Sequence, residues 1–385
     1  MTNYLSIFIT ALRLGLTSFG GPTAHLAYFH QTYVRDKKWL DDKNYADLVA
    51  LSQFLPGPAS SQVGIGIGLI RGGIVGAVIS FIGFTLPSVI ILISLAIFTQ
   101  DLSGQVGFIH GLKLVAVAII IQAIFQMAKN LTPDLKRQII AFLALSTILL
   151  WQNMFATLIV IVVAGIIGGL IIRSDQSETP DHSTSYLSKK VGVICLTLYF
   201  SLLFILPFLN KLSNSIWIDF IDRFYRAGAL VFGGGHVVLP LLETEFVTSG
   251  LVNEDVFLAG YGLTQAVPGP LFTFAAYLGT VIHGPLGGVI AIVAIFLPAF
   301  LLIVGALPFW TLLKRNRQMR NVINGMNAAV VGILMATLYH PIWKTTVLKP
   351  IDFVIVVGLY FLLNSVKVPP WLIVLLGATL GFVFL

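Results

Sequence analysis

Two Pro-Gly-Pro tripeptides, at residues 56–58 and 268–270, interrupt apolar stretches of this chain. Proline removes a backbone donor and glycine weakens a helix, so each tripeptide predicts the end of one helix and the start of another. Ser60 and Ser61 follow the first tripeptide, and Thr273 follows the second. Free N–H groups at a helix start carry a partial positive charge and favour anions. The chemistry that these stretches predict is the binding of an anion by backbone amides and hydroxyls.

The two stretches differ in polarity. Ser60, Ser61 and Gln62 are polar, whereas Phe272 and Phe274 flank a single hydroxyl in the second copy. We therefore expect the first copy to hold more of the anion.

Two arginines, Arg13 and Arg226, each lie six residues before a Phe-Gly-Gly sequence and inside an apolar run. A charge at such a depth is costly and points to a function, and the planar guanidinium matches an oxyanion. Two other interpretations stay open. Arg13 is near enough to a helix end to extend to lipid headgroups, and Arg226 follows Asp222 by four residues, a spacing that permits an ion pair.

Glycine pairs and glutamines accompany both arginines. The pairs at 20–21 and 233–234 either cradle a ligand with backbone amides or let helices pack closely. Gln53 and Gln265 each precede a Pro-Gly-Pro by three residues, and they suit either donation to an oxyanion or hydrogen bonding between helices.

Three residues are candidates for proton coupling. His25 and His236 follow the glycine pairs, and histidine changes charge near neutral pH, although an interfacial histidine is the commoner explanation. Glu243 lies near an apolar boundary, and no acid mirrors it in the first half of the chain.

The composition is that of a membrane protein: of 385 residues, 57% are hydrophobic and 10% are charged, and the mean hydropathy is +0.93. The net charge of +7 resides in short connections, which suits membrane orientation and anionic lipid better than nucleic acid. Cys195 is the single cysteine, so no intrachain disulfide can form. Hydrolase, ATP-binding and metal motifs are absent, so we expect no enzyme, cofactor or metal.

Apolar runs recur along the whole chain and predict an all-α polytopic protein of about 11–13 transmembrane or re-entrant helices. The first run has no secretory cleavage pattern, so we expect it to be retained. Residues 30–47 suit an interfacial amphipathic helix or an ordinary loop equally well. Clusters of Lys and Arg favour a cytoplasmic N-terminus.

The sequence contains an internal duplication. "RLGLTSFGGP" at 13–22 is echoed by "RAGALVFGGG" at 226–235, and "SQFLPGP" at 52–58 by "TQAVPGP" at 264–270. Pro87 matches Pro298, and "HGLKLVAV" at 110–117 matches "NGMNAAVV" at 324–331. The offsets stay between 211 and 214 residues, so chance is a poor explanation.

The duplication predicts four parts: a first repeat (1–172), a polar linker (173–190), an extra connecting helix (191–210) and a second repeat (211–385). Seven apolar runs separate equivalent elements. If all seven cross the membrane, the second repeat is inverted, as in many secondary transporters.

The blocks "FGGPTAH", "LSQFLPGPASSQ", "FTLPS", "FGGGHVVLPLLE" and "LTQAVPGP" resemble the chromate ion transporter family in its long, two-domain form. The resemblance covers essentially the whole chain. One departure is Gly235, which stands where the first copy has Pro22, so the two breaks need not share one geometry. The family's signature positions in this sequence are Phe19, Gly20, Gly21, Pro22, Gln53, Pro56, Gly57, Pro58, Phe232, Gly233, Gly234, His236, Gln265, Pro268, Gly269 and Pro270.

The resemblance implies a multi-pass inner-membrane secondary transporter that exports chromate, a tetrahedral dianion, by use of the proton gradient. The expected mechanism is alternating access around an anion site near the bilayer midplane. A permease for sulfate or another anion, a passive anion channel and, less readily, a membrane enzyme or assembly factor remain alternatives. The sequence fixes neither transport direction nor oligomeric state, and a homodimer is left open.

Overall fold

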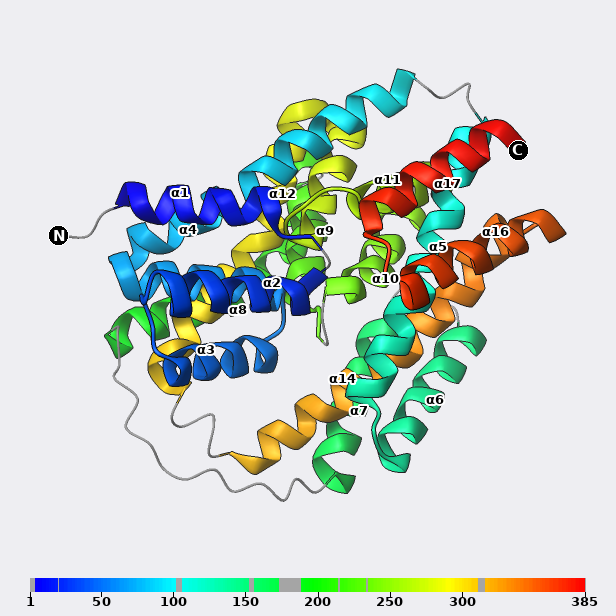
Figure 1. Ribbon diagram of the computed structural model, residues 1–385. Coiled ribbons are helices and arrows are strands. Elements are labelled where there is room, and N and C mark those ends of the chain that lie inside the picture. The colour runs from blue at the N-terminus through cyan, green and yellow to red at the C-terminus, as the bar shows by residue number, and fades with distance from the viewer. Residues whose placement is uncertain are drawn as a thin grey trace. The chain divides into compact units, whose positions relative to one another are not determined.

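The computed structural model of the chain describes residues 4–19, 21–101, 106–151, 156–172, 188–213, 215–232, 235–310 and 316–384. Within these ranges all regular secondary structure is helical, which confirms the expected all-α fold (Figure 1). Five of the described helical segments are long and apolar enough to cross a membrane, and four shorter ones are also apolar. The chain is therefore an all-α, multi-pass membrane protein.

The chain divides into two compact units, and each unit draws on both halves of the sequence. The first unit contains residues 1–93, 175–235 and 268–317, and the second contains residues 94–174, 236–267 and 318–385. The first unit comprises α1 (Tyr4–Thr17), α2 (Gly21–Phe29), η1 (His30–Asp36), α3 (Asp42–Phe54), most of α4 (Ala59–Asp101), α8 (Lys189–Ser213), α9 (Ile216–Ala229), η4 (Leu271–Thr273), α12 (Phe274–Ala306) and η5 (Leu307–Phe309).

The first Pro-Gly-Pro forms the tip of a helical hairpin. The helix α3 ends at Phe54 and α4 begins at Ala59, as the sequence predicts. Leu48 lies against Gly66, where an added Cβ would be 2.6 Å from its Cδ1. Residues so far on either side of the tip meet only if the two helices run antiparallel. With 13 residues, α3 is about 20 Å long and too short to cross about 30 Å of hydrocarbon alone.

The long helix α4 is itself two helices joined by a second tight turn. Gly73 has φ +62°, a value that favours glycine, and the chain reverses there. Ser80 Oγ donates a hydrogen bond of 2.8 Å to Gly64 O, although an unbroken helix would hold these residues about 24 Å apart. Gly68 and Gly76 make the close backbone contact at this turn.

The helix α12 repeats this turn 211 residues later. Gly284 has φ +69°, and Gly279 packs on the backbone of Gly287. The long apolar segments Ala59–Thr99 and Leu271–Phe309 are therefore each a pair of packed helices.

Reciprocal hydrogen bonds connect the two copies within the first unit. Gly57 N donates to Val231 O at 2.7 Å, and Gly269 N donates to Ser18 O at 2.9 Å. Gly57 is equivalent to Gly269, and Ser18 to Val231, so each tripeptide binds the break that precedes the glycine pair of the other copy. Such exchange, in which i contacts j and j contacts i, is the pattern of a two-fold axis.

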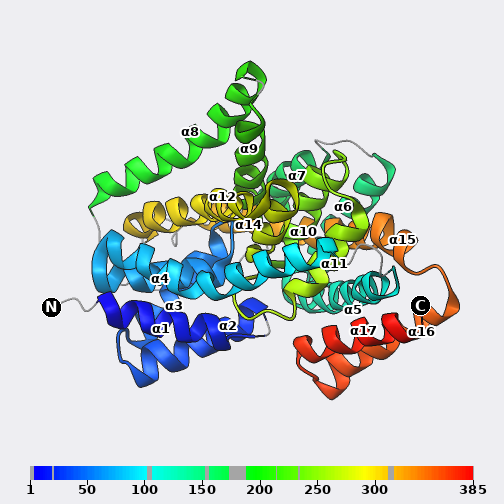
Figure 2. The ribbon, with the colours of Figure 1, turned by 90° about the horizontal axis from the view of Figure 1, so that it is seen from above.

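The helix α8, which the sequence predicts to be an extra connecting helix, packs against α9 and α12 (Figure 2). Tyr199 Oη donates to Ala229 O at 2.9 Å, and Tyr225 Oη donates to Tyr199 O at 2.9 Å, so α8 is hydrogen-bonded to α9. Of the predicted polar linker, residues 173–187 lie outside the described residues.

The polar segment 30–47 is helical over η1 and from the start of α3. Asp41 caps α3 by accepting from Asn44 N. Asp42 accepts from His30 Nε2 at 2.8 Å, and this hydrogen bond lowers the pKa of the Asp42 carboxyl. Its position at the membrane interface stays a prediction.

The second unit has the same exchange between copies. Gly111 of α5 packs on Gly381 of α17, and Gly325 of α14 packs on Gly168 of α7, which are equivalent pairs. Close packing at small residues is typical of membrane helices.

The second unit comprises the end of α4, α5 (Val106–Leu131), α6 (Leu135–Leu150), α7 (Ala156–Ile171), α10 (Val238–Leu242), η3 (Glu243–Val247), α11 (Glu254–Thr264), α14 (Arg317–Thr337), η6 (Leu338–Trp343), α15 (Lys344–Thr346), α16 (Pro350–Phe361), η7 (Leu362–Val366) and α17 (Pro370–Phe384). The short helix η2 (Gly235–Val237) contains the point in the sequence at which the first unit ends and the second begins.

Candidate functional site

The start of α4 places three polar side chains in the interior of the first unit. Ser60 and Ser61 are each 2% exposed, and Gln62 is fully buried. Gln62 Nε2 donates to Pro56 O at 2.8 Å, which ties the hairpin tip to the new helix. Ser61 Oγ and Gln62 Oε1 are buried and have no hydrogen-bond partner among the described residues. Buried polar atoms are normally paired, so a bound group is a natural partner for them.

His25 of α2 lies beside this helix start and is 1% exposed. Its Nε2 is 3.1 Å from Ser18 O, and its Nδ1 is 3.3 Å from Ser60 Oγ. Because a carbonyl only accepts, Nε2 carries a proton, and in the neutral ring Nδ1 accepts from the Ser60 hydroxyl. The edge of the Phe84 ring completes the packing, at a centroid distance of 5.7 Å.

Ser18 joins three of these features. Its carbonyl accepts from both His25 and Gly269, and its own hydroxyl is buried with no partner among the described residues. The unpartnered oxygens of Ser18 and Ser61 can both donate a hydrogen bond. The Ser61 hydroxyl at the start of α4 is suited to an oxyanion, and Ser18 is connected to the same helix start through His25 and Ser60.

The second Pro-Gly-Pro offers fewer donors. Thr273 Oγ1 already donates to Pro270 O at 2.6 Å, and Phe272 and Phe274 are fully buried on either side. The two copies therefore differ in the hydroxyl available to a ligand: that of Ser61 is unpaired, whereas that of Thr273 already donates a hydrogen bond.

The two matched arginines have different surroundings. Arg226 Nε is 3.1 Å from Asp222 Oδ2, and Asp222 is 1% exposed, so the open interpretation of an ion pair is realised. Arg13 is exposed and has no ion pair with any described residue. It lines a cavity beside α1.

The other predicted residues are distributed as follows. Gln53 is exposed, Phe19, Pro22 and Phe232 are half-buried, and Gly21 has φ +80° in open space. Pro58 and Pro268 are buried like Pro270, and Pro56 is half-buried. Gln265 belongs to the second unit, where its Nε2 is buried without a described partner. Gly20, Gly233, Gly234 and the side chain of His236 lie outside the described residues.

Glu243 also belongs to the second unit and begins η3, outside the apolar helices that are long enough to span a membrane. Its Oε1 accepts from Thr248 Oγ1 at 3.2 Å. Burial raises the pKa of its carboxyl to about 7, and the Thr248 hydrogen bond opposes this shift. A carboxyl with this pKa exchanges a proton near neutral pH.

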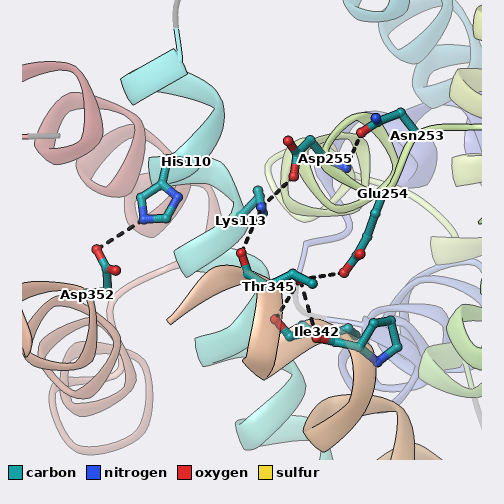
Figure 3. Close-up of polar contacts among 9 residues, drawn as sticks. His110, Lys113, Asn253, Glu254, Asp255, Ile342, Thr345 and Asp352 are labelled. Atoms are coloured by element: carbon teal, nitrogen blue, oxygen red, sulfur yellow. Dashed lines mark hydrogen bonds and ion pairs between the residues drawn. The ribbon is translucent and has the colours of Figure 1, made fainter. Parts of the chain in front are cut away.

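Four residues that the sequence reasoning did not single out form two polar pairs in the second unit (Figure 3). His110 Nε2 lies 3.0 Å from Asp352 Oδ1, and Lys113, which is 5% exposed, pairs with Asp255. Asp352 also accepts from Lys349 N at 2.8 Å at the start of α16. The sequence signal was a polar pair three residues apart in the first part of α5, which is otherwise apolar up to residue 121. These pairs connect α5 to α11 and α16.

The chain was compared with known proteins. A family model described as "Chromate transporter" matches residues 5–170 and 218–382. An uncharacterized transporter of Methanocaldococcus jannaschii is 30% identical over 99% of this chain and 94% of its own length. A chromate transport protein of Pseudomonas aeruginosa is 26% identical over 87% of this chain and 80% of its own. A chromate transport protein of Cupriavidus metallidurans is 25% identical over 97% of this chain and 91% of its own length. No solved structure matches the chain.

Proposed function

Because this chain belongs to the chromate transporter family, we propose that it is a secondary transporter that exports chromate across the cell's inner membrane, coupled to the proton gradient. The observation that carries the proposal is the family match over both halves of a multi-pass membrane protein whose buried helix start presents unpaired hydroxyls. Relatives named as chromate transport proteins support the substrate.

The proposed site lies at the start of α4. Backbone amides of the first turn and the hydroxyls of Ser18, Ser60 and Ser61 would surround the oxyanion. Hydrogen bonds to a charged acceptor are about twice as strong as neutral ones, so a few buried donors give useful affinity. The site needs no lysine or arginine, because the helix start contributes positive potential.

His25 is the proposed proton-binding group of this site. In the neutral ring Nδ1 accepts a hydrogen bond from the Ser60 hydroxyl, so that hydroxyl cannot donate to an anion at the same time. After protonation Nδ1 would donate to Ser60 Oγ, and the Ser60 hydroxyl would then be free to donate to the anion. A buried imidazolium also needs an anion nearby. Protonation of His25 and anion binding would thus favour each other, by the same factor in both directions.

That geometry favours a second candidate function, a proton–oxyanion symporter for chromate or sulfate. Mutual stabilisation of proton and anion promotes their movement together, whereas export driven by proton entry requires the two to exchange. Glu243, with its pKa near 7, is a candidate for the separate proton site that exchange would need.

We further propose that the two repeats are inverted and that the protein works by alternating access. The reciprocal bonds of Gly57 and Gly269 support a two-fold relation between the copies. If the two conformations of the transport cycle exchange equivalent contacts between the copies, the two conformations have similar energies.

Proteoliposomes that contain the purified chain test this function. Vesicles are loaded with radiolabelled chromate or sulfate, and efflux is followed with the outside acidic, with the inside acidic and without a gradient. Faster chromate efflux with the outside acidic supports proton-coupled export, and faster efflux with the inside acidic supports symport. A channel would only let the anion move down its own concentration gradient, at a rate that an uncoupler leaves unchanged. That result would overturn the proposal.

A further inference from the structure

A cavity of about 420 Å³ lies beside α1 in the first unit. Side chains of α1, the end of α2 and η1 form its walls, together with Lys37, which follows η1 directly. Its walls include the two cations Arg13 and Lys37, the acid Asp36 and the apolar Ile9. It is distinct from the buried hydroxyl group at the start of α4, none of whose residues lines it.

The charges in this cavity do not balance. Neither Arg13 nor Lys37 has an ion pair with any described residue. Asp36, the acid in the wall, accepts a hydrogen bond of 2.8 Å from Gln31 Nε2. Two cations therefore face one carboxylate that already has a partner.

The internal duplication shows what is missing. Arg226, the counterpart of Arg13, pairs with Asp222 four residues earlier. The residue equivalent to Asp222 in the first copy is Ile9, which has no charge and lines the cavity. Where the second copy has its own carboxylate, the first copy has an open space beside the guanidinium.

Three apolar side chains on the face of α1 that carries Arg13 are exposed. Leu5, Ile9 and Leu16 are 65%, 54% and 52% exposed, and their spacing of three to four residues places them on the same face as Arg13. In a bilayer such side chains contact acyl chains. An occupant with an anionic head and an apolar tail would match both the cations and this face.

We propose that this cavity binds the phosphate of an anionic phospholipid, held by Arg13 and Lys37, with an acyl chain along Leu5 and Ile9. A guanidinium binds phosphate through two parallel hydrogen bonds, and an ammonium binds it as a point charge. Basic pockets at a membrane surface select anionic headgroups. This site does not depend on the proposed transport function, and it gives Arg13 a role outside the substrate site.

Native mass spectrometry of the full chain tests the proposal. The detergent-purified protein is mixed with equal amounts of phosphatidylglycerol and phosphatidylcholine, and the retained lipid is counted. The wild type is expected to retain phosphatidylglycerol in preference. Arg13→Gln and Lys37→Gln are each expected to weaken this retention by at least about ten-fold, the lower end of the effect of one hydrogen bond to a charged group.

Arg35→Gln is the matched control, because Arg35 is an exposed cation of the same segment that pairs with Asp42 and does not line the cavity. This variant should retain the lipid as the wild type does. Both cavity cations are exposed, so all variants should fold, and gel filtration verifies this. Equal retention of phosphatidylglycerol by the wild type and by both cavity variants would overturn the proposal. Inorganic phosphate or chromate retained in place of lipid, and lost in Arg13→Gln, would overturn the lipid as the occupant.

Discussion

Removal of one buried hydroxyl separates a ligand-binding role from a structural role at the start of α4. Ser61 and Thr273 are equivalent in the duplication, and both are almost fully buried. The Ser61 hydroxyl has no partner among the described residues, whereas the Thr273 hydroxyl donates to Pro270 O. Removal of the hydroxyl should therefore have different consequences at the two positions.

The expected magnitudes follow from hydrogen-bond energetics. A hydrogen bond to a charged group contributes about 1.5–3 kcal/mol, so Ser61→Ala should raise the Kd for chromate about 10- to 150-fold. It removes an unpaired polar atom from the interior, so the Tm of the ligand-free protein should stay the same or rise. Thr273→Val removes one of two hydrogen bonds to the Pro270 carbonyl, which keeps its bond of 3.0 Å from Thr273 N. The change should therefore cost about 0.5–1.5 kcal/mol of stability, lower the Tm slightly and leave the Kd unchanged.

Isothermal titration with chromate and thermal unfolding, both on purified protein in one detergent, measure the two quantities. Chromate should raise the Tm of the wild type and of Thr273→Val, and raise that of Ser61→Ala only at higher concentration. An unchanged Kd together with a lowered Tm in Ser61→Ala would refute the reasoning, because the hydroxyl would then serve only the fold.

Three further changes test the site and its supports. Gly57→Ala forces a side chain to φ +118° and within 3.2 Å of Ala299 Cβ, so about 1–3 kcal/mol of stability and most transport should be lost. The control Gly250→Ala, at φ +76° with open space around it, should transport normally. Equal transport by both variants would contradict the importance of the hairpin tip. His25→Gln keeps a donor and an acceptor without a charge, so chromate flux should persist but lose its response to a pH gradient; an intact response in proteoliposomes would move proton binding to another group. Arg226→Gln leaves the buried Asp222 without its hydrogen-bonded cation, so stability should fall by about 3–5 kcal/mol and the amount of folded protein in the membrane should drop; Asp222→Asn in the same chain should restore it. A stable Arg226→Gln protein with impaired transport would instead assign Arg226 to the substrate.

Local chemistry made parts of the fold readable from the sequence. The ends of α3 and α4 around residues 56–58 follow from proline and glycine, whose effects depend on the backbone alone. The Asp222–Arg226 pair follows from a four-residue spacing, which the sequence left as one of two interpretations. In both cases the residues that interact are near neighbours in the chain.

The remaining features depend on contacts between distant segments. His25 meets Ser60 35 residues away, and nothing in either local sequence specifies that partner. Ser18 was not singled out, because a lone serine before Phe-Gly-Gly carries little signal until Gly269 is seen to bind its carbonyl. The cavity at Arg13 requires η1 to return beside α1, and the hydrophobic pattern of α1 alone does not predict this.

The position of the chromium atom in a chromate-bound crystal, located by its anomalous scattering, tests the central claim most directly. We predict one principal peak in the first unit, within hydrogen-bonding reach of the Ser61 hydroxyl and the first amides of α4, that is absent in Ser61→Ala crystals grown at the same chromate concentration. A principal peak elsewhere, whether beside Arg13, at Thr273 or in the second unit, would contradict a chromate site at the first Pro-Gly-Pro.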